Sequence, residues 1–141
     1  MPTSIKLALI GCALIAGYFA QDIATWLTED NKMPLSQYCQ LSRHACEQEA
    51  ISVTLSRDIA QPLVPVQISA EWPNRHAETL RLTLNGYEMD MGTALFELKQ
   101  AKDGLYQAEI LLPACTVENM TWVGQLSDGQ QSINLAVRMA R

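Results

Sequence analysis

The sequence predicts an all-β domain in which antiparallel strands form a sandwich, preceded by one N-terminal transmembrane helix. Two observations predict the domain: apolar and polar residues alternate with a period of two between residues 51 and 139, and turn residues separate the alternating runs. Because each strand then has one apolar face, two sheets must bury these faces against each other. One observation predicts the helix: residues 7–20 carry no charge.

Length and composition limit the organisation of the chain. The 141 residues are 48% hydrophobic, which predicts one globular domain with an N-terminal extension. We divide the chain into a transmembrane anchor or signal at 1–27, a juxtamembrane linker at 28–47 and the β domain at 48–141. A net charge of −5 without any cluster of basic residues argues against nucleic-acid binding.

The uncharged run at 7–20 is the candidate membrane segment. Its fourteen residues are short for a span, which needs about 20. The helix can extend over Ile5–Leu27, because the stem of Lys6 can snorkel and Trp26 suits a membrane interface. A cleaved signal peptide, a lipoprotein site at Cys12 and a buried helix of a soluble protein are the alternatives. We expect an uncleaved single-pass anchor.

Charges at the two ends of this helix predict its orientation. Lys6 and the amino terminus lie at one end, whereas Asp22, Glu29 and Asp30 lie at the other. The positive-inside rule then places the N-terminus in the cytoplasm and the C-terminal domain outside it.

The chain contains four cysteines. In an oxidising compartment, Cys39 and Cys46 are expected to form a disulfide that fixes the segment leading into the first strand, and their spacing is not that of a redox-active Cys-x-x-Cys pair. Cys12 is expected to be an inert apolar residue of the helix. Cys115 is left over; it is buried, paired elsewhere or reactive, and we expect it to be buried.

The alternating runs predict about seven short strands. Their apolar positions are 51, 53 and 55; 64–72; 80, 82 and 84; 96 and 98; 106–112; 120, 122 and 126; and 133–139. Trp72-Pro73-Asn74, Asp103-Gly104 and Asp128-Gly129 are expected turns. The number and spacing of the strands favour an Ig-like antiparallel β-sandwich. Because both Cys39 and Cys46 precede the first predicted strand, it would not be an antibody-type domain.

The segment Gly86–Gly92 contains the candidate site. Thioethers and thiolates are soft ligands that select Cu(I), and Met89 and Met91 point the same way if the segment is extended. Loops cluster at the ends of a sandwich, so Cys115 and Met120 could join them. The competing interpretation is that the methionines fill gaps in the core.

Other sites receive less support from the sequence. His44 and His76 could each add an imidazole ligand, although their polar neighbours favour exposed histidines without a function. No catalytic motif of a hydrolase, metalloprotease or phosphate-binding enzyme occurs. We therefore expect a protein that is not an enzyme and has no cofactor, Cu(I) being the one candidate.

The domain resembles the YtkA/FixH-type Ig-like domains of small membrane-anchored periplasmic proteins. The resemblance covers about residues 50–140 and rests on four stretches: Gly86 with Met89-Asp90-Met91-Gly92, Phe96-Glu97-Leu98, Gly104-Leu105-Tyr106 with Leu112-Pro113, and Met120-Thr121-Trp122. It implies a bacterial inner-membrane location with the domain in the periplasm. Some members are associated with copper handling and cytochrome oxidase assembly. The histidine-bearing methionine loop of some copper-handling domains has no histidine near Met89 and Met91 here.

Two functional hypotheses follow. The first is a non-enzymatic membrane-anchored module that binds a protein partner in the cell envelope. The second is a copper-binding accessory protein for oxidase assembly that uses Met89 and Met91. A copper site requires these methionines on an accessible rim, with Cys115 or Met120 near them, whereas a binding module requires an exposed apolar patch.

Overall fold

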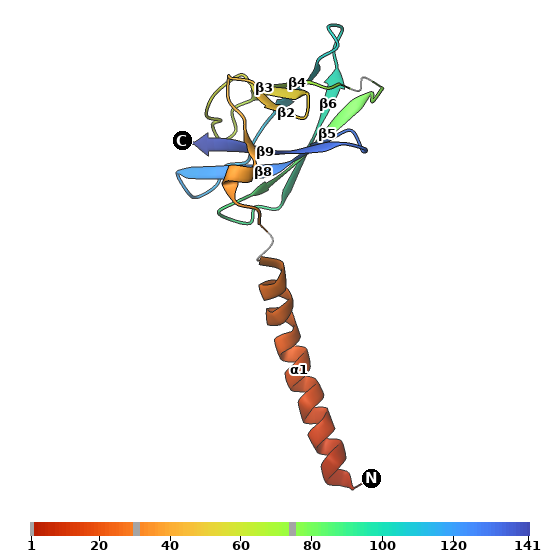
Figure 1. The fold of residues 1–141 in the computed structure, drawn as a ribbon. Coiled ribbons are helices and arrows are strands. Elements are labelled where there is room, and N and C mark those ends of the chain that lie inside the picture. Colours follow the sequence, from red (N-terminus) through yellow and green to blue (C-terminus); the bar gives the residue numbers. More distant parts are fainter. Residues whose placement is uncertain (1, 30–31, 74–75) are drawn as a thin grey trace. The chain divides into compact units, whose positions relative to one another are not determined.

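The structure is a computed structural model that describes residues 2–29, 32–73 and 76–141 (Figure 1). The chain separates into two units, Met1–Met33 and Pro34–Arg141, and each is described by itself. Two residues used in the predictions lie outside the described residues. They are Asp30, one of the charges that predicted the orientation of the helix, and Asn74, the last residue of a predicted turn.

The first unit contains one helix, α1 (Thr3–Glu29). No helix in the described ranges is both long and apolar enough to cross a membrane. A helix thus lies where the anchor at residues 5–27 was expected, and its membrane-spanning role stays a prediction.

The second unit consists of strands and one short helix. A 3-10 helix, η1 (Leu35–Gln37), precedes the first strand. The strands are β1 (Cys39–Gln40), β2 (Cys46–Gln48), β3 (Ile51–Leu55), β4 (Val66–Glu71), β5 (Thr79–Gly86), β6 (Thr93–Gln100), β7 (Tyr106–Ile110), β8 (Asn119–Ser127) and β9 (Ser132–Ala140). Strands β3 to β9 confirm the seven runs predicted from alternation. Strand β1 and the first two residues of β2 lie in the predicted linker at 28–47, where no strand was expected.

All of these strands belong to one hydrogen-bonded sheet with the order β1-β9-β8-β5-β6-β7-β4-β3-β2. β1 pairs with β9 in parallel, and the other neighbours are antiparallel. A mostly β fold is therefore confirmed. The predicted division into two packed sheets is not confirmed, because the pairing of β6 with β7 keeps the sheet continuous.

The alternation of side chains places one face of each long strand in the core. In β5, Leu80, Leu82 and Leu84 are fully buried, and they lie opposite Leu98, Phe96 and Ala94 of β6. Buried residues from β3 to β9 merge into a single apolar cluster. The apolar residues that recur with a period of two in the sequence are therefore the ones that face this cluster.

The two ends of the strand order meet each other. Cys39 of β1 and Cys46 of β2 form the predicted disulfide, with 6.0 Å between their Cα atoms. Between them, the Leu41 amide donates to the Ala136 carbonyl of β9 (2.8 Å), and the Ser42 carbonyl accepts from the Leu55 amide of β3 (2.8 Å). The segment between the cysteines therefore closes the sheet on itself.

The sheet is weakly joined at one internal place. β6 pairs with β5 over seven residue pairs from Thr79↔Lys99 to Asn85↔Thr93, but it pairs with β7 only at Lys99↔Gln107 and Gln100↔Tyr106. The turn that joins β6 to β7 projects at the top of the domain in Figure 1. Beyond this turn the two strands separate.

Candidate functional site

The segment Gly86–Gly92 joins β5 to β6 and is held by β8. Gly86 lies opposite Trp122, and the Tyr87 amide donates to the Thr121 carbonyl (2.9 Å). The Glu88 carboxylate accepts from the Thr121 amide at 2.7 Å. These contacts fix the first half of the segment against the start of β8.

The second half of this segment is a local turn. The Asp90 carboxylate accepts from the Gly92 amide (2.9 Å), which is the geometry of an Asx turn. Gly92 has a φ of +73°, a conformation that glycine adopts without steric cost. Met89 and Met91 are therefore carried by a folded turn and not by an extended strand.

Two of the candidate sulfur residues meet over Gly86. A Cβ atom on Gly86 would collide with the carbonyl oxygen of Met89 and with the methyl group of Met120. Met89 is 37% exposed, and Met91 is half-buried against the core. Met120 belongs to the buried cluster. The structure thus brings the Met89 backbone to the Met120 side chain and leaves the Met89 side chain at the surface.

Cys115 lies in the loop before β8 and is buried, as expected. Its thiol donates to the Val117 carbonyl at 3.4 Å, and its carbonyl accepts from the Arg141 guanidinium at 2.8 Å. Arg141 therefore helps to hold this loop in place. The second free cysteine, Cys12, is exposed on α1.

Trp122 places a polar atom in the core beside this segment. Its side chain is fully buried, and its indole Nε1 has no hydrogen-bond acceptor among the described residues. A buried donor without a partner costs about 1–3 kcal/mol. Its strand neighbour Gly86 leaves room only for the Met89 carbonyl and the Met120 methyl group.

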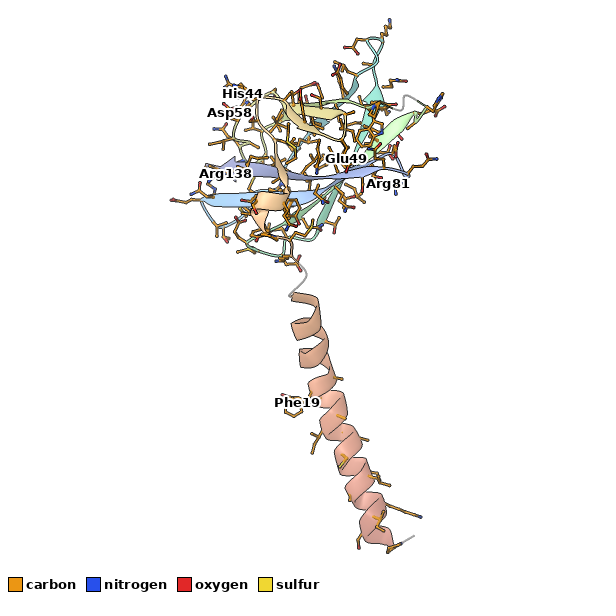
Figure 2. All side chains as sticks on the ribbon, viewed as in Figure 1. Phe19, His44, Glu49, Asp58, Arg81 and Arg138 are labelled. Atoms are coloured by element: carbon orange, nitrogen blue, oxygen red, sulfur yellow. A yellow bond between two sulfur atoms is a disulfide. The ribbon has the colours of Figure 1, made fainter. Side chains whose placement is uncertain are left out.

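The histidines lie apart in sequence and on different elements. His44 is exposed in the segment between β1 and β2, where the Ser42 hydroxyl accepts from the His44 amide (3.1 Å). Figure 2 shows its side chain at the edge of the domain. His76 is exposed in the connection between β4 and β5. Within the described residues, no group of three His, Cys, Asp or Glu side chains lies close enough to bind one metal ion.

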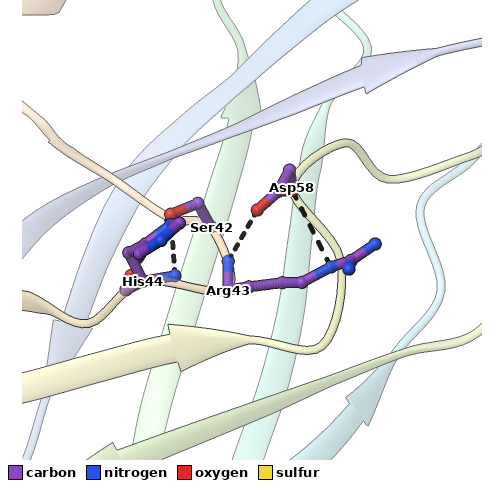
Figure 3. Close-up of polar contacts among 4 residues, drawn as sticks. All are labelled: Ser42, Arg43, His44 and Asp58. Atoms are coloured by element: carbon purple, nitrogen blue, oxygen red, sulfur yellow. Dashed lines mark hydrogen bonds and ion pairs between the residues drawn. The ribbon is translucent and has the colours of Figure 1, made fainter.

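Arg43 links the segment between β1 and β2 to the loop after β3 (Figure 3). Its amide donates to the Asp58 carboxylate at 2.9 Å, and its guanidinium Nε lies 3.7 Å from the same carboxylate. Both side chains are more than half exposed, so the ion pair contributes at most about 1 kcal/mol. This contact is structural support for the closed sheet.

Asp128 organises the turn between β8 and β9. Its carboxylate accepts from the Gln131 amide (2.7 Å), the Gln130 amide (2.8 Å) and the Trp72 indole (2.8 Å). The hydrogen bond from Gln131 is the largest cause that holds the pKa of Asp128 below its usual value, and partial burial opposes it. The same carboxylate thus joins this turn to the end of β4.

An exposed apolar surface before the start of β4 and beyond the end of β7 was not predicted. Val66 pairs with Ile110, and beyond this pair the Leu63 amide donates to the Leu112 carbonyl, so the segments around Pro65 and Leu111 lie next to each other. Leu63 is 63% and Leu111 47% exposed, and Pro65 and Pro113 are exposed as well. We call Leu63, Pro65, Leu111 and Pro113 the Leu63 surface.

Leu63 lies in an unusual backbone conformation. The Val64 amide donates to the Gln61 carbonyl (3.3 Å), which closes a turn with Pro62 and Leu63 at its centre. Leu63 has a φ of +57°, so the turn follows the type II pattern, in which glycine is preferred at this position. The Leu63 amide donates to the Leu112 carbonyl at 3.0 Å and anchors the turn to the end of β7.

A sequence signal for this surface existed. In a strand with one solvated face, apolar residues alternate with polar ones. The stretches Pro62-Leu63-Val64-Pro65 and Leu111-Leu112-Pro113 break that rule, because their outward positions are apolar too. The left-handed conformation of Leu63 has no such signal.

Comparison with known proteins assigns no function to this chain, so its function is inferred from the geometry described above. No model of a known protein family matches the chain, and no curated protein is significantly similar to it. The resemblance to YtkA/FixH-type domains therefore stays a prediction.

Proposed function

We propose that the β domain is a non-enzymatic module that binds a protein partner through the Leu63 surface. One observation carries the proposal: Leu63 is a large apolar side chain that is 63% exposed while its backbone has a φ of +57°. A left-handed conformation costs a residue with a Cβ about 1–2 kcal/mol. Burial of the side chain in the domain does not offset that cost.

Strained residues of this kind cluster at functional sites. The turn needs a residue with positive φ, and glycine would satisfy it without strain. A leucine at this position instead presents an apolar side chain to solvent. An apolar pocket on a partner would bury that side chain and offset the backbone cost on binding.

The surface is rigid enough to bind without a large entropic cost. Leu112, whose carbonyl accepts the hydrogen bond from the Leu63 amide, is buried. Val66 and Ile110, which pair with each other next to this contact, are buried as well. With its amide anchored in this way, the backbone of Leu63 loses little conformational freedom when a partner covers the side chain. A protein partner with a complementary apolar pocket is the occupant that this chemistry fits.

The proposed compartment is oxidising and lies outside the cytoplasm, with the periplasm as the proposed location. The disulfide between Cys39 and Cys46 supports this, because such bonds persist in secreted and periplasmic proteins and are rare in the cytosol. Both cysteines are only half-buried, so reductants of the cytosol would reach them.

The proposed fold is an Ig-like sandwich of the YtkA/FixH type. Two groups of strands, β1-β9-β8-β5-β6 and β7-β4-β3-β2, are joined by only two residue pairs between β6 and β7. This weak junction supports two packed layers around one core. Binding surfaces at the ends of such sandwiches are formed by the connections between strands.

Site-specific photo-cross-linking tests the proposed binding function. A photoreactive amino acid would replace Leu63 or Leu111 in the full chain, expressed in the cells that normally produce it. Ser132, an exposed residue of β9, serves as the control position. We expect a discrete protein adduct from positions 63 and 111 and none from position 132. Adducts of equal yield at all three positions, or at none, would contradict the proposal.

A second candidate function is Cu(I) binding by Met89 and Met91, with Cys115 or Met120 near them. The specific observation in its favour is that Met89 is exposed at the rim while its carbonyl meets the Met120 methyl group over Gly86. Thioether ligands select Cu(I) over harder ions. Buried Cys115 and Met120 would reach the ion only after the loops shift.

A competition titration tests the copper function. The full chain is titrated with Cu(I) against a chelator, beside Met89→Leu and Met91→Leu variants. Met33→Leu, which changes a methionine outside the β domain, is the control. Stoichiometric binding that is lost in the first two variants and kept in the control supports the site. Binding that is absent or unchanged in all variants would exclude it.

A further inference from the structure

The free edge of β6 is the longest unpaired strand edge in the described domain. β6 pairs with β5 along Thr93–Lys99, whereas its other side pairs with β7 only at Lys99 and Gln100. The terminal strands β1 and β2 are two and three residues long and meet each other through the disulfide. Thr93–Leu98 therefore offers backbone donors and acceptors that the described strands leave unpaired.

Three consecutive side chains in the middle of this edge, Ala94, Leu95 and Phe96, are apolar and incompletely buried. Leu95 points away from the core and is 63% exposed. Ala94 and Phe96 point toward the core but are only half-buried against it. The segment contains no proline, the residue that most directly blocks pairing at a strand edge.

The sequence of this edge is complementary to itself. In antiparallel pairing about a two-fold axis at Leu95, Leu95 lies opposite the same residue of a second copy. Thr93 then lies opposite Glu97, and the small Ala94 lies opposite the large Phe96. Directly opposite side chains on one face are the pairs that stabilise a sheet.

The two registers centred further along β6 are less favourable. An axis at Glu97 would place two like charges opposite each other, which is destabilising. An axis at Phe96 would bring Lys99 into the pairing, although its free edge already pairs with Gln107 of β7. The register centred on Leu95 pairs the whole of Thr93–Glu97 and avoids both conflicts.

We propose that two copies of this chain associate by antiparallel pairing of their β6 edges, centred on Leu95. The pairing extends the sheet across the two-fold axis and buries both Leu95 side chains against each other. An isologous contact of this kind closes after two copies. The proposal is independent of partner binding through the Leu63 surface, which lies in the connections next to β4 and β7.

Disulfide trapping tests the register. In a Cys12→Ser background, which removes the exposed thiol of α1, Leu95→Cys places two thiols opposite each other across the axis. Leu63→Cys is the matched control, because Leu63 has the same exposed fraction as Leu95. Glu97→Cys is the register control, since position 97 faces position 93 of the second copy.

Under mild oxidation we expect a covalent dimer, of twice the 15.7 kDa mass of the chain, from Leu95→Cys and at least ten times less from the two controls. Equal dimer from Leu63→Cys would show random collision, and equal dimer from Glu97→Cys would show another register; either result overturns the proposal. No dimer from Leu95→Cys overturns it as well.

Sedimentation of the otherwise natural chain gives a second measurement, because a cysteine variant could misfold. Leu95→Lys should weaken dimerisation at least tenfold by placing two positive charges opposite each other, whereas Leu63→Lys should leave it unchanged. A natural chain that stays monomeric, or equal weakening by both variants, would overturn the proposal. If the photo-cross-linking experiment gives no adduct at the Leu63 surface, that result counts against partner binding and not against the dimer.

Discussion

Cys39 and Cys46 connect β1 to β2, the two strands at opposite ends of the sheet order. Their seven-residue separation closes a short loop, for which chain entropy gives a stabilisation of about 2–3 kcal/mol. We predict that Cys39→Ala/Cys46→Ala lowers the free energy of unfolding by at least this amount. Urea denaturation of the full chain measures it.

Reductant provides the control for the disulfide prediction. It should destabilise the natural chain as much as the double substitution does, and it should leave the double variant unchanged. Because Leu41 and Ser42 also close the sheet by backbone hydrogen bonds, the reduced domain should stay folded. A reduced domain of unchanged stability would show that these hydrogen bonds alone hold the two ends together.

The Asp128 carboxylate makes stability depend on pH. Hydrogen bonds from the Gln131 amide, the Gln130 amide and the Trp72 indole hold its pKa below the usual value of 3.8 in the folded state. The folded state therefore binds fewer protons than the unfolded state at low pH. The resulting stabilisation is present above about pH 4 and is lost as the pH falls through the lowered pKa.

Variants of Asp128 and Trp72 check this pH dependence. Asp128→Asn should lower the free energy of unfolding at neutral pH and flatten its decrease in acid. Trp72→Phe removes one of the three hydrogen-bond donors to Asp128, so it should have the same two effects at smaller size. Urea unfolding between about pH 6 and pH 2.5 is the measurement. An acid slope that is the same in Asp128→Asn and the natural chain would contradict the assignment.

The turn between β2 and β3 stores backbone strain. Its two residues, Glu49 and Ala50, have φ values of 51° and 64°. This pattern of a type I′ turn favours glycine at the second position. We predict that Ala50→Gly raises the free energy of unfolding by about 0.5–1 kcal/mol. Ala114→Gly, at an exposed position without positive φ, should lower it slightly. Equal effects at both positions would refute the strain.

Much of the β domain could be predicted because buried and exposed positions alternate along each strand, and apolar and polar residues alternate with them in the sequence. Strand β5 shows the reason: each inward leucine is fully buried and each outward neighbour is not. The Cys39–Cys46 bond could also be predicted from spacing and compartment. Strands β1 and β2 could not, because two or three residues carry no period, and β1 pairs with the distant strand β9.

The candidate site was only partly predictable. Loop clustering was the reason to place Met120 near the Met89 segment, and a Cβ on Gly86 would meet both the Met89 carbonyl and the Met120 methyl group, whereas metal binding there stays a prediction. The conformation of Leu63 was not predictable, because φ depends on the Leu112 carbonyl that holds its amide. The N-terminal helix was predicted from its uncharged run and is found as α1 (Thr3–Glu29), whereas its crossing of a membrane stays a prediction.

The most direct test of the central claim is to measure stability and binding together in Leu63→Gly. If Leu63 is retained for a partner in spite of its backbone strain, this variant should gain about 0.5–1 kcal/mol of unfolding free energy. It should also lose the adduct formed from a photoreactive residue at position 111. Leu111→Gly, without positive φ, should lose stability. A Leu63→Gly variant that is less stable and still forms the adduct would contradict the account.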